Sequence, residues 1–355
     1  MNAAQPAPQP NRLQPRQVRT VNLDRQVCRI RFSPCGRFLV GGGFDATVRR
    51  LEYTEAALTP IAHLTGHRGW VQALAFHPDR RQLFTGDSWG EVRSWPYAEP
   101  APQPARTIAA HDGWVRDLAI SPNGQLLATC GADRKVCLWS TENGRKLHEL
   151  TGHPDQVFSV AFHPDNALVV SGDLRGNVYE WNVATGRRGR EFDCRQLYAL
   201  NRLQDMGGAR RLVFDAAGRT LACAGGRPGT SGGVPTILLL DWTTGRVQHT
   251  VSVGTSTDGF VFDLAFHASG YLMAVTSGTP GAGKFFFHRP GEPAPFFLTT
   301  AMPNCHSLAV HPDGRRLVVA ATNGSSNGNG RPAGNAYPGN FSPLHLWELP
   351  ANPGT

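Results

Sequence analysis

A segment that recurs along the chain at a nearly constant spacing restricts the possible folds more than any other feature of the sequence. Three copies are clear: LTGHRGWVQALAFHPDRRQLFTGDSWGEVRSW ends at Trp95, IAAHDGWVRDLAISPNGQLLATCGADRKVCLW at Trp139 and LTGHPDQVFSVAFHPDNALVVSGDLRGNVYEW at Trp181. Each copy separates short apolar runs by turns of Gly, Pro and Asp, which predicts three strands. The apolar residue that ends the first strand recurs at Phe32, Phe76, Ile120, Phe162, Phe214, Phe266 and Val310. The steps of 44, 44, 42, 52, 52 and 44 residues predict seven copies.

The repeated segment resembles the WD-repeat family of β-propellers, in which the period is about 40–45 residues. The resemblance covers Gln17 to Leu349 and is stronger in three repeats than in the other four. It rests on a Gly-His pair near the start of the repeat, at Gly66-His67 and Gly152-His153, and on the Trp near its end. The Asp of the family's Trp-Asp pair is absent from all repeats. The resemblance implies an all-β fold, a seven-bladed propeller of four-stranded antiparallel blades.

A strand that precedes the first repeat supports a closed ring. The last repeat ends with its third strand in SPLHLWELP, whereas QVRTVNL, at 17–23, stands before the first repeat. An unpaired sheet edge is prone to aggregation, so we expect the N-terminal strand to pair with Leu344 to Glu348 as the outer strand of the last blade. We therefore expect a flexible Pro/Gln-rich tail at 1–16, one propeller at 17–349 and a C-terminal tail at 350–355.

His, Asp and Ser or Thr recur together in the clearest repeats. The resemblance implies that His111, Thr129, Asp133 and Trp139 form a structural hydrogen-bonded tetrad in the third repeat. A buried imidazole and a buried indole N–H need such partners in any case. A catalytic triad would not recur in several copies, and the sequence has no G-x-S-x-G nucleophile elbow. We predict no catalytic, metal-binding or cofactor-binding residues.

A Walker-like stretch, GTPGAGK at 278–284, raises the alternative of nucleotide binding. The motif requires a Ser or Thr after the Lys and a helix that starts there, because the hydroxyl binds Mg²⁺ and the helix N-terminus faces the phosphates. Phe285 stands at the hydroxyl position, and the run KFFFH predicts a strand. We interpret the stretch as a hairpin connection that matches by chance.

Composition limits the remaining function classes. The net charge of +8 comes mainly from Arg residues that are scattered along the chain, whereas a nucleic-acid footprint is clustered. Seven cysteines without C-x-x-C spacing indicate free thiols in a reducing compartment. The N-terminus lacks an apolar signal segment, and no apolar run is long enough to span a membrane. We expect a cytoplasmic protein without membrane or nucleic-acid partners, and a monomeric propeller within a complex.

The lengthened connections predict which face binds a partner. Connections between the second and third strands, and those leading into the next first strand, grow in repeats five to seven and share one rim, so we expect every insertion on that rim. Residues just before the first strands lie there as well. Aromatic side chains beside a central depression favour a partner contact, although each ring could instead cover the core edge of its own blade. The candidate partner-binding residues are Trp70, Trp114, Phe260, Arg68, Asp112, Gln26 and Gln156.

We therefore expect a non-enzymatic scaffold that binds a peptide or protein on one propeller face. Two alternatives remain open: a propeller enzyme with a metal or quinone in the central channel, and a nucleic-acid binder that uses the basic surface. The enzyme would need His, Asp or Glu on the first strands, where we expect mostly Val, Ala, Leu and Phe.

Overall fold

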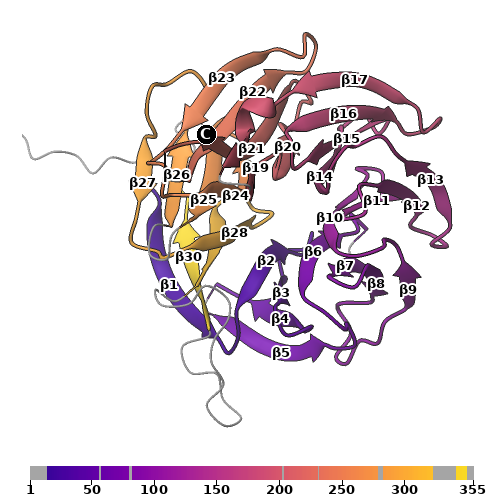
Figure 1. The fold of residues 1–355 in the computed structure, drawn as a ribbon. Coiled ribbons are helices and arrows are strands. Elements are labelled where there is room, and N and C mark those ends of the chain that lie inside the picture. The colour runs from indigo at the N-terminus through magenta and orange to yellow at the C-terminus, as the bar shows by residue number, and fades with distance from the viewer. Residues whose placement is uncertain are drawn as a thin grey trace, which may run out of the picture.

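The computed structural model describes residues 14–55, 57–79, 82–201, 204–230, 232–278, 283–322 and 341–349. They form seven four-stranded antiparallel sheets and one two-stranded sheet. The seven larger sheets stand as blades around a common centre (Figure 1). The predicted all-β, seven-bladed propeller is therefore confirmed.

Within each blade the strands follow one another from the centre outward, and we number the blades 1 to 7 in chain order. The inner strands are β2 (Val27–Phe32), β6 (Val71–Phe76), β10 (Val115–Ile120), β14 (Val157–Phe162), β20 (Arg211–Phe214), β24 (Phe260–Phe266) and β28 (Cys305–Val310). The second strands are β3 (Phe38–Gly43), β7 (Leu83–Asp87), β11 (Leu126–Gly131), β15 (Leu168–Asp173), β21 (Thr220–Pro228), β25 (Leu272–Ser277) and β29 (Arg316–Ala321). The inner strands end at the seven apolar residues from which the repeat was recognised.

The third and outer strands complete the blades. The third strands are β4 (Val48–Tyr53), β8 (Glu91–Trp95), β12 (Val136–Ser140), β16 (Asn177–Asn182), β22 (Gly233–Asp241), β26 (Lys284–His288) and β30 (Ser342–Glu348). The outer strands are β5 (Leu58–Leu64), β9 (Arg106–Ala109), β13 (Lys146–Leu150), β17 (Arg188–Asp193), β23 (Val247–Ser252), β27 (Phe297–Thr299) and, for blade 7, β1 (Arg16–Leu23).

The hydrophobic core is divided among the contacts between neighbouring blades. Seven clusters of buried side chains each join two adjacent blades. The second strands do not alternate between buried and exposed residues. All residues of β7, for example, are buried, because a blade packs against a neighbour on both faces. Outer strands such as β17 are largely exposed.

The ring closes through the N-terminal strand, as predicted. β1 pairs antiparallel with β30, with Val21 opposite Leu344 and Arg16 opposite Glu348. In Figure 1 the indigo β1 lies along the yellow β30, so the first and last described strands share blade 7. Of the expected tails at 1–16 and 350–355, residues 1–13 and 350–355 lie outside the described residues, whereas Arg16 already belongs to β1.

Connections leave the blades at two rims. The turn rim carries the connections from inner to second strand and from third to outer strand, whereas the loop rim carries the other two kinds. An inserted segment on the loop rim contains η1 (Arg195–Leu197) and the hairpin of β18 (Tyr198–Asn201) and β19 (Gln204–Gly207). The expected loop at 323–340 lies outside the described residues.

The prediction that all insertions share one rim is wrong. The segment 96–105 joins β8 to β9 and the segment 289–296 joins β26 to β27, and both lie on the turn rim. The repeat was recognised from its first three strands only, so the prediction did not consider the connection from the third strand to the outer strand.

The Walker-like stretch is followed by a strand, as predicted. Residues 279–282 lie outside the described residues, but Lys284 begins β26 and pairs with Thr276 of β25. Phe285 is fully buried, and the Lys284 ammonium forms an ion pair with the Asp258 carboxylate. The charge of Lys284 is thus already paired within the fold.

Candidate functional site

The loop rim carries a connected row of aromatic rings around the centre of the propeller. It begins with Phe44 in blade 1, whose ring centroid lies 5.1 Å from that of Trp70 in blade 2. Trp70 in turn lies 5.4 Å from Trp114 of blade 3, in an edge-to-face arrangement that is favourable for aromatic pairs. Trp70 remains 38% exposed despite both contacts, so its ring is available to a partner.

Arginines continue this row through blades 3 to 6. The Arg116 guanidinium lies 4.4 Å from the Trp114 ring centroid and 4.9 Å from that of Phe158. The Arg210 guanidinium lies 4.8 Å from Phe158 and 4.4 Å from Phe260. These are cation–π distances, so rings and guanidinium groups hold one another in place.

The row ends in blades 6 and 7. The ring centroids of Phe260 and Phe262 lie 6.5 Å apart, and Phe262 meets His306 edge to face at 5.6 Å. The aromatic–arginine belt, as we call the whole row, consists of Phe44, Trp70, Trp114, Arg116, Phe158, Arg210, Phe260, Phe262 and His306. It passes through all seven blades and surrounds the mouth of the central channel.

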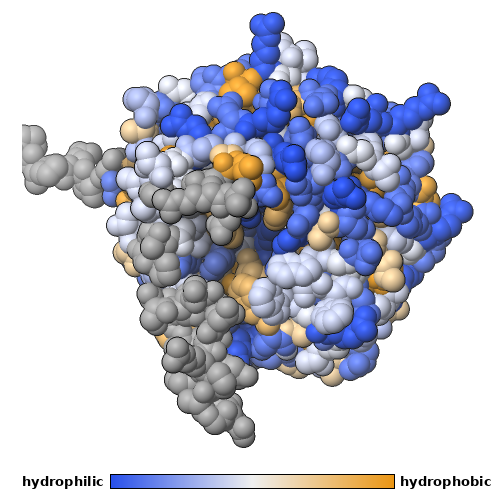
Figure 2. All heavy atoms as spheres, in the orientation of Figure 1, coloured by the Kyte–Doolittle hydropathy of each residue, from blue (hydrophilic) through white to orange (hydrophobic). Residues whose placement is uncertain are grey.

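A cavity of about 250 Å³ opens inside the belt. We call it the channel-mouth cavity, and it is lined by Cys28, Arg29, Phe44, Gln72, Arg116, Phe158, Arg210, Phe262 and His306. Figure 2 shows one face of the disc, which is hollowed at the centre of the ring. The volume lies below the ~300–1,000 Å³ of small-molecule sites, so it suits one or two side chains rather than a large cofactor.

Seven lining residues occupy equivalent places in the seven repeats. Six of them stand at β-bulges at the start of their inner strands, such as the bulge between Val115 and Asp117, and the seventh, Arg210, directly precedes β20. A bulge redirects one side chain out of the strand's alternation, which here turns it toward the cavity. The seven are Cys28, Gln72, Arg116, Phe158, Arg210, Phe262 and His306.

Beneath the cavity, a charged network crosses the channel. Arg211 Nη1 of blade 5 donates to Asp117 Oδ2 of blade 3 at 2.9 Å, and Arg31 Nη1 of blade 1 donates to Asp263 Oδ2 of blade 6 at 2.7 Å. Arg211 also lies 3.1 Å from Asp263, which joins the two pairs. Val, Ala, Leu and Phe do make up most of the inner strands, as expected, but these buried Arg and Asp side chains among them were not foreseen.

Serines extend the charged network to blades 4 and 7. Ser159 Oγ donates to Asp117 Oδ2 at 2.9 Å, and Ser307 Oγ donates to Asp263 Oδ2 at 2.6 Å. The charged network, defined as Arg29, Arg31, Asp117, Ser159, Arg211, Asp263 and Ser307, joins six of the seven blades. It holds three guanidinium groups and two carboxylates, so its net charge is positive.

Burial and pairing oppose each other in this network. Burial alone would raise the pKa of the Asp263 carboxyl, but Arg31, Arg211 and Arg29 hold that pKa well below its usual range. Burial lowers the pKa of Arg31 to about 10, and the Asp263 charge limits the decrease. Both groups therefore remain charged near neutral pH.

Of the seven residues predicted for the partner face, five lie in, beside or beneath the belt and two lie outside it. Trp70, Trp114 and Phe260 all belong to the belt, and Gln156 accepts a 2.6 Å hydrogen bond from Arg116 Nη2. Gln26 lies 1% exposed beneath the rim.

The two predicted charged residues lie outside the belt. Arg68 forms an exposed ion pair with Glu91, and its guanidinium lies 5.9 Å from the centroid of the highly exposed Trp89 ring. Asp112 is exposed, and its backbone N–H donates to Asp133 Oδ2. The structure thus separates these two residues from the aromatic candidates.

Sequence reasoning missed the arginines and most rings of the belt. Selected residues such as Trp70 and Trp114 stand immediately before the inner strands, whereas the channel-mouth residues stand two positions later, as Arg116 does after Trp114. Alignment of the seven repeats at this second position would have found them. The sequence does not reveal the β-bulge, however, and without it the side chain at this position cannot be assigned to the cavity.

The tetrad side chains lie away from the cavity, inside the blade. In blade 3, His111 Nδ1 lies 2.9 Å from Asp133 Oδ1 and His111 Nε2 lies 2.8 Å from Thr129 Oγ1. Trp139 Nε1 donates to the same hydroxyl at 3.0 Å. Equivalent chains occur in blades 2 and 4, through His67, Thr85, Asp87 and Trp95, and through His153, Ser171, Asp173 and Trp181. They connect two strands and a loop within one blade.

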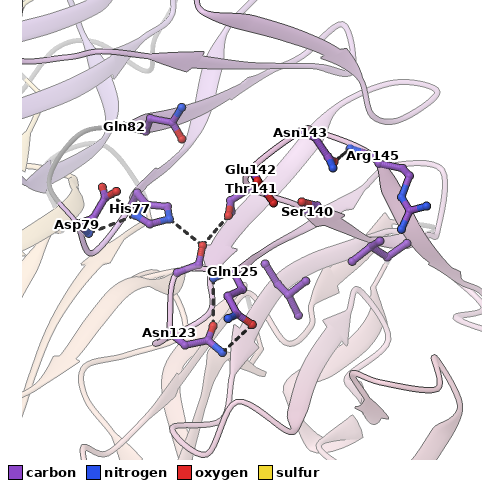
Figure 3. A pocket seen from close by; sticks show the side chains of 13 residues that line it. His77, Asp79, Gln82, Asn123, Gln125, Ser140, Thr141, Glu142, Asn143 and Arg145 are labelled. Carbon is purple, nitrogen blue, oxygen red and sulfur yellow. Dashed lines mark hydrogen bonds and ion pairs between the residues drawn. The ribbon is translucent and has the colours of Figure 1, made fainter.

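A larger cavity, of about 680 Å³, lies on the turn rim between blades 2 and 3 (Figure 3). Its polar groups are engaged with one another. His77 Nε2 and Thr141 Oγ1 both donate to the Gly124 carbonyl, at 2.7 and 2.6 Å, and Asn123 Nδ2 donates to Gln125 Oε1 at 3.4 Å. The bond from His77 to Gly124 connects the two blades, so we interpret this hollow as a junction.

The described residues lack two features that other functions would use. In that part of the chain no three His, Cys, Asp or Glu side chains are grouped so as to hold a metal ion. No described helix is long and apolar enough to cross a membrane.

Comparison with known proteins identifies the repeat. The family model described as WD domain, G-beta repeat matches residues 16–49, 58–96, 102–140 and 144–182. Each match begins with the outer strand of the preceding blade and continues into the inner strands of blades 1 to 4. The U5 small nuclear ribonucleoprotein 40 kDa protein of Pongo abelii is 39% identical over 56 residues, 16% of each chain. Eukaryotic translation initiation factor 3 subunit I is 38% identical over 63 residues in Aspergillus terreus (18% of this chain and 19% of the relative).

The longest of these similarities covers a third of the chain. Eukaryotic translation initiation factor 3 subunit I of Aspergillus fumigatus is 30% identical over 126 residues, 35% of this chain and 33% of the relative. The aligned segments thus span between 16% and 33% of these relatives' length. Aligned segments of 56 to 126 residues correspond to about one to three repeats.

Proposed function

Since this chain belongs to the WD-repeat family, we propose that it is a non-enzymatic scaffold that binds a peptide or protein partner on its loop rim. The aromatic–arginine belt is the observation that carries the proposal. Trp, Tyr and Arg side chains in a partly covered central position are the usual anchors of protein interfaces. In this chain Trp70, Trp114 and Arg116 stand together at such a position.

The rigidity of the belt supports the same function. Each ring is held by a neighbouring ring or guanidinium group, so little side-chain entropy is lost when a partner covers it. The charged network beneath fixes the inner strands that carry the belt. The proposed scaffold is thus a preformed surface.

The names of the relatives agree with a role in assemblies. One is named as a protein of a small nuclear ribonucleoprotein and the other as a subunit of a translation initiation factor. By analogy, we propose that this chain is a monomeric propeller within a multi-protein complex in the cytoplasm, without a cofactor.

Affinity capture followed by mass spectrometry would identify the partner, and binding of that partner to variants would test the face. Trp70→Ala and Trp114→Ala should each weaken binding by more than about 1 kcal/mol with little change in melting temperature. Asp79→Ala and Asn123→Ala on the turn rim are the matched controls and should leave the affinity unchanged. Weaker binding by the controls but not by the tryptophan variants would place the partner on the turn rim.

A further inference from the structure

Two guanidinium groups at the channel-mouth cavity have no carboxylate partner among the described residues. Neither Arg116 nor Arg210 takes part in any ion pair of that part of the chain. Arg116 donates to the neutral amide of Gln156, and Arg210 Nε donates to the Gly207 carbonyl. Arg116 Nε is buried and makes no hydrogen bond to the described residues. Most arginines near this channel are paired with an acid, so these two stand apart.

The remaining groups of the cavity do not balance this charge. Burial raises the pKa of the Cys28 thiol to about 12 and lowers the pKa of the His306 imidazole to about 4, so both are neutral near pH 7. Arg29 lies 3.6 Å from Asp263, but that carboxylate already serves Arg31 and Arg211. The cavity therefore carries an excess of positive charge.

The positive charges of the two arginines also repel each other. Both lie within 5 Å of the Phe158 ring centroid, at 4.9 and 4.8 Å. Burial lowers the pKa of Arg210 to about 10, and the nearby charge of Arg116 contributes to the decrease. An anion placed between the guanidinium groups would relieve both the repulsion and the lost hydration.

Three aromatic rings in or beside the cavity are already approached by arginines, which makes them poor sites for a cation. The ring of Phe158 is approached by both arginines, and those of Trp114 and Phe260 by one each. A Lys or Arg side chain of a partner would meet positive charge where a cation site needs an open ring face. The same contacts hinder the stacking of nucleic-acid bases on these rings.

We propose that the channel-mouth cavity binds an oxyanion, a carboxylate or a phosphoryl group, that is carried by one side chain of a peptide segment of the partner. Arg116 and Arg210 are its ligands, and the small cavity volume fits one such side chain. The planar guanidinium fork matches the oxygens of both groups. This inference rests on the proposed function, because it names the chemistry that the loop rim recognises.

Peptide pools would test the inference without a known partner. Binding of the full chain would be measured at low salt to fluorescent short peptides with randomised flanks and a fixed central residue, which is glutamate, phosphoserine, glutamine or lysine. We expect the glutamate pool, the phosphoserine pool or both to bind about tenfold more tightly than the glutamine pool, and the lysine pool most weakly. The ratio of the first two distinguishes a carboxylate from a phosphoryl group.

Matched variants assign the effect to the cavity. Arg116→Gln, Arg210→Gln and the double variant should remove the preference for the acidic pools, whereas Arg187→Gln, an exposed arginine on the turn rim, should retain it. Circular dichroism and melting temperature would establish that each variant is folded. Should the double variant unfold, the single variants and a competition with inorganic phosphate on the native chain still decide the matter.

Each outcome supports or overturns the inference. Equal binding of the glutamine and acidic pools, or an unchanged preference in Arg116→Gln and Arg210→Gln, overturns it. Binding of a single-stranded oligonucleotide that depends on both arginines and falls steeply with salt would replace the peptide by a nucleic acid. If Trp70→Ala weakens binding of the captured partner while the arginine variants do not, the proposed function stands and this inference fails.

Discussion

Arg211 Nη1 lies 2.9 Å from Asp117 Oδ2, although the two residues are 94 positions apart and belong to blades that are not neighbours. The contact therefore crosses the channel instead of joining adjacent blades. Through Asp263 the same arginine is linked to Arg31 of blade 1. Such a buried network makes the stability of the whole ring depend on a few charges.

The charged network predicts a large effect of one neutral substitution. Asp263→Asn keeps the side-chain size but leaves Arg31 and Arg211 without this carboxylate, and should lower the free energy of unfolding by about 3–5 kcal/mol. Urea denaturation would measure it. Asp193→Asn removes an exposed ion pair with Arg195 and should cost at most about 1 kcal/mol. Similar losses in both variants would contradict a special role of the channel network.

The blade 3 tetrad predicts that two substitutions are not additive. His111→Ala and Asp133→Ala should each destabilise the protein by about 1–3 kcal/mol, because each leaves a polar partner without its hydrogen bond. The double variant should lose much less than the sum, since both residues belong to one chain of hydrogen bonds. Full additivity in denaturation experiments would indicate that the two side chains act independently.

Ring closure by β1 predicts different results for two truncations. Removal of residues 1–12 leaves β1 complete and should change the melting temperature little. Removal of residues 1–24 exposes the edge of β30 and should lower the melting temperature and promote aggregation. Differential scanning calorimetry and light scattering would compare the two. Equal midpoints would show that the closing strand contributes nothing to stability.

His306 predicts a pH dependence in the acidic range. Burial lowers its pKa from 6.5 to about 4, so between these values the unfolded chain binds a proton that the folded chain does not. The free energy of unfolding therefore falls as the pH falls through this window, with a limiting slope of about 1.4 kcal/mol per pH unit.

His306→Gln removes this titrating group and should flatten the dependence. Urea denaturation at a series of pH values would compare the variant with the native chain. Burial also lowers the pKa of His345, but that residue is present in both proteins and cancels in the comparison. Parallel curves for the two proteins would mean that His306 is not buried as a neutral group.

The sequence alone determined the seven-bladed fold and its closure. Strand length, turn residues and repeat period are local properties, so the inner-strand ends from Phe32 to Val310 and the pairing of β1 with β30 could be predicted. The aromatic residues Trp70 and Trp114 could be placed at one rim, because alternate connections of an up-and-down blade leave at the same end.

Only the tertiary structure decided which side chains meet at the channel. A bulge at the start of six of the seven inner strands turns residues such as Arg116 and Phe158 toward the cavity, and the residue after the bulge, such as Asp117, enters the network beneath. No local pattern pairs Asp117 with Arg211, since their contact exists only when the ring brings two distant blades face to face. Closure of the ring therefore decides which charged side chains of the inner strands form ion pairs and which do not.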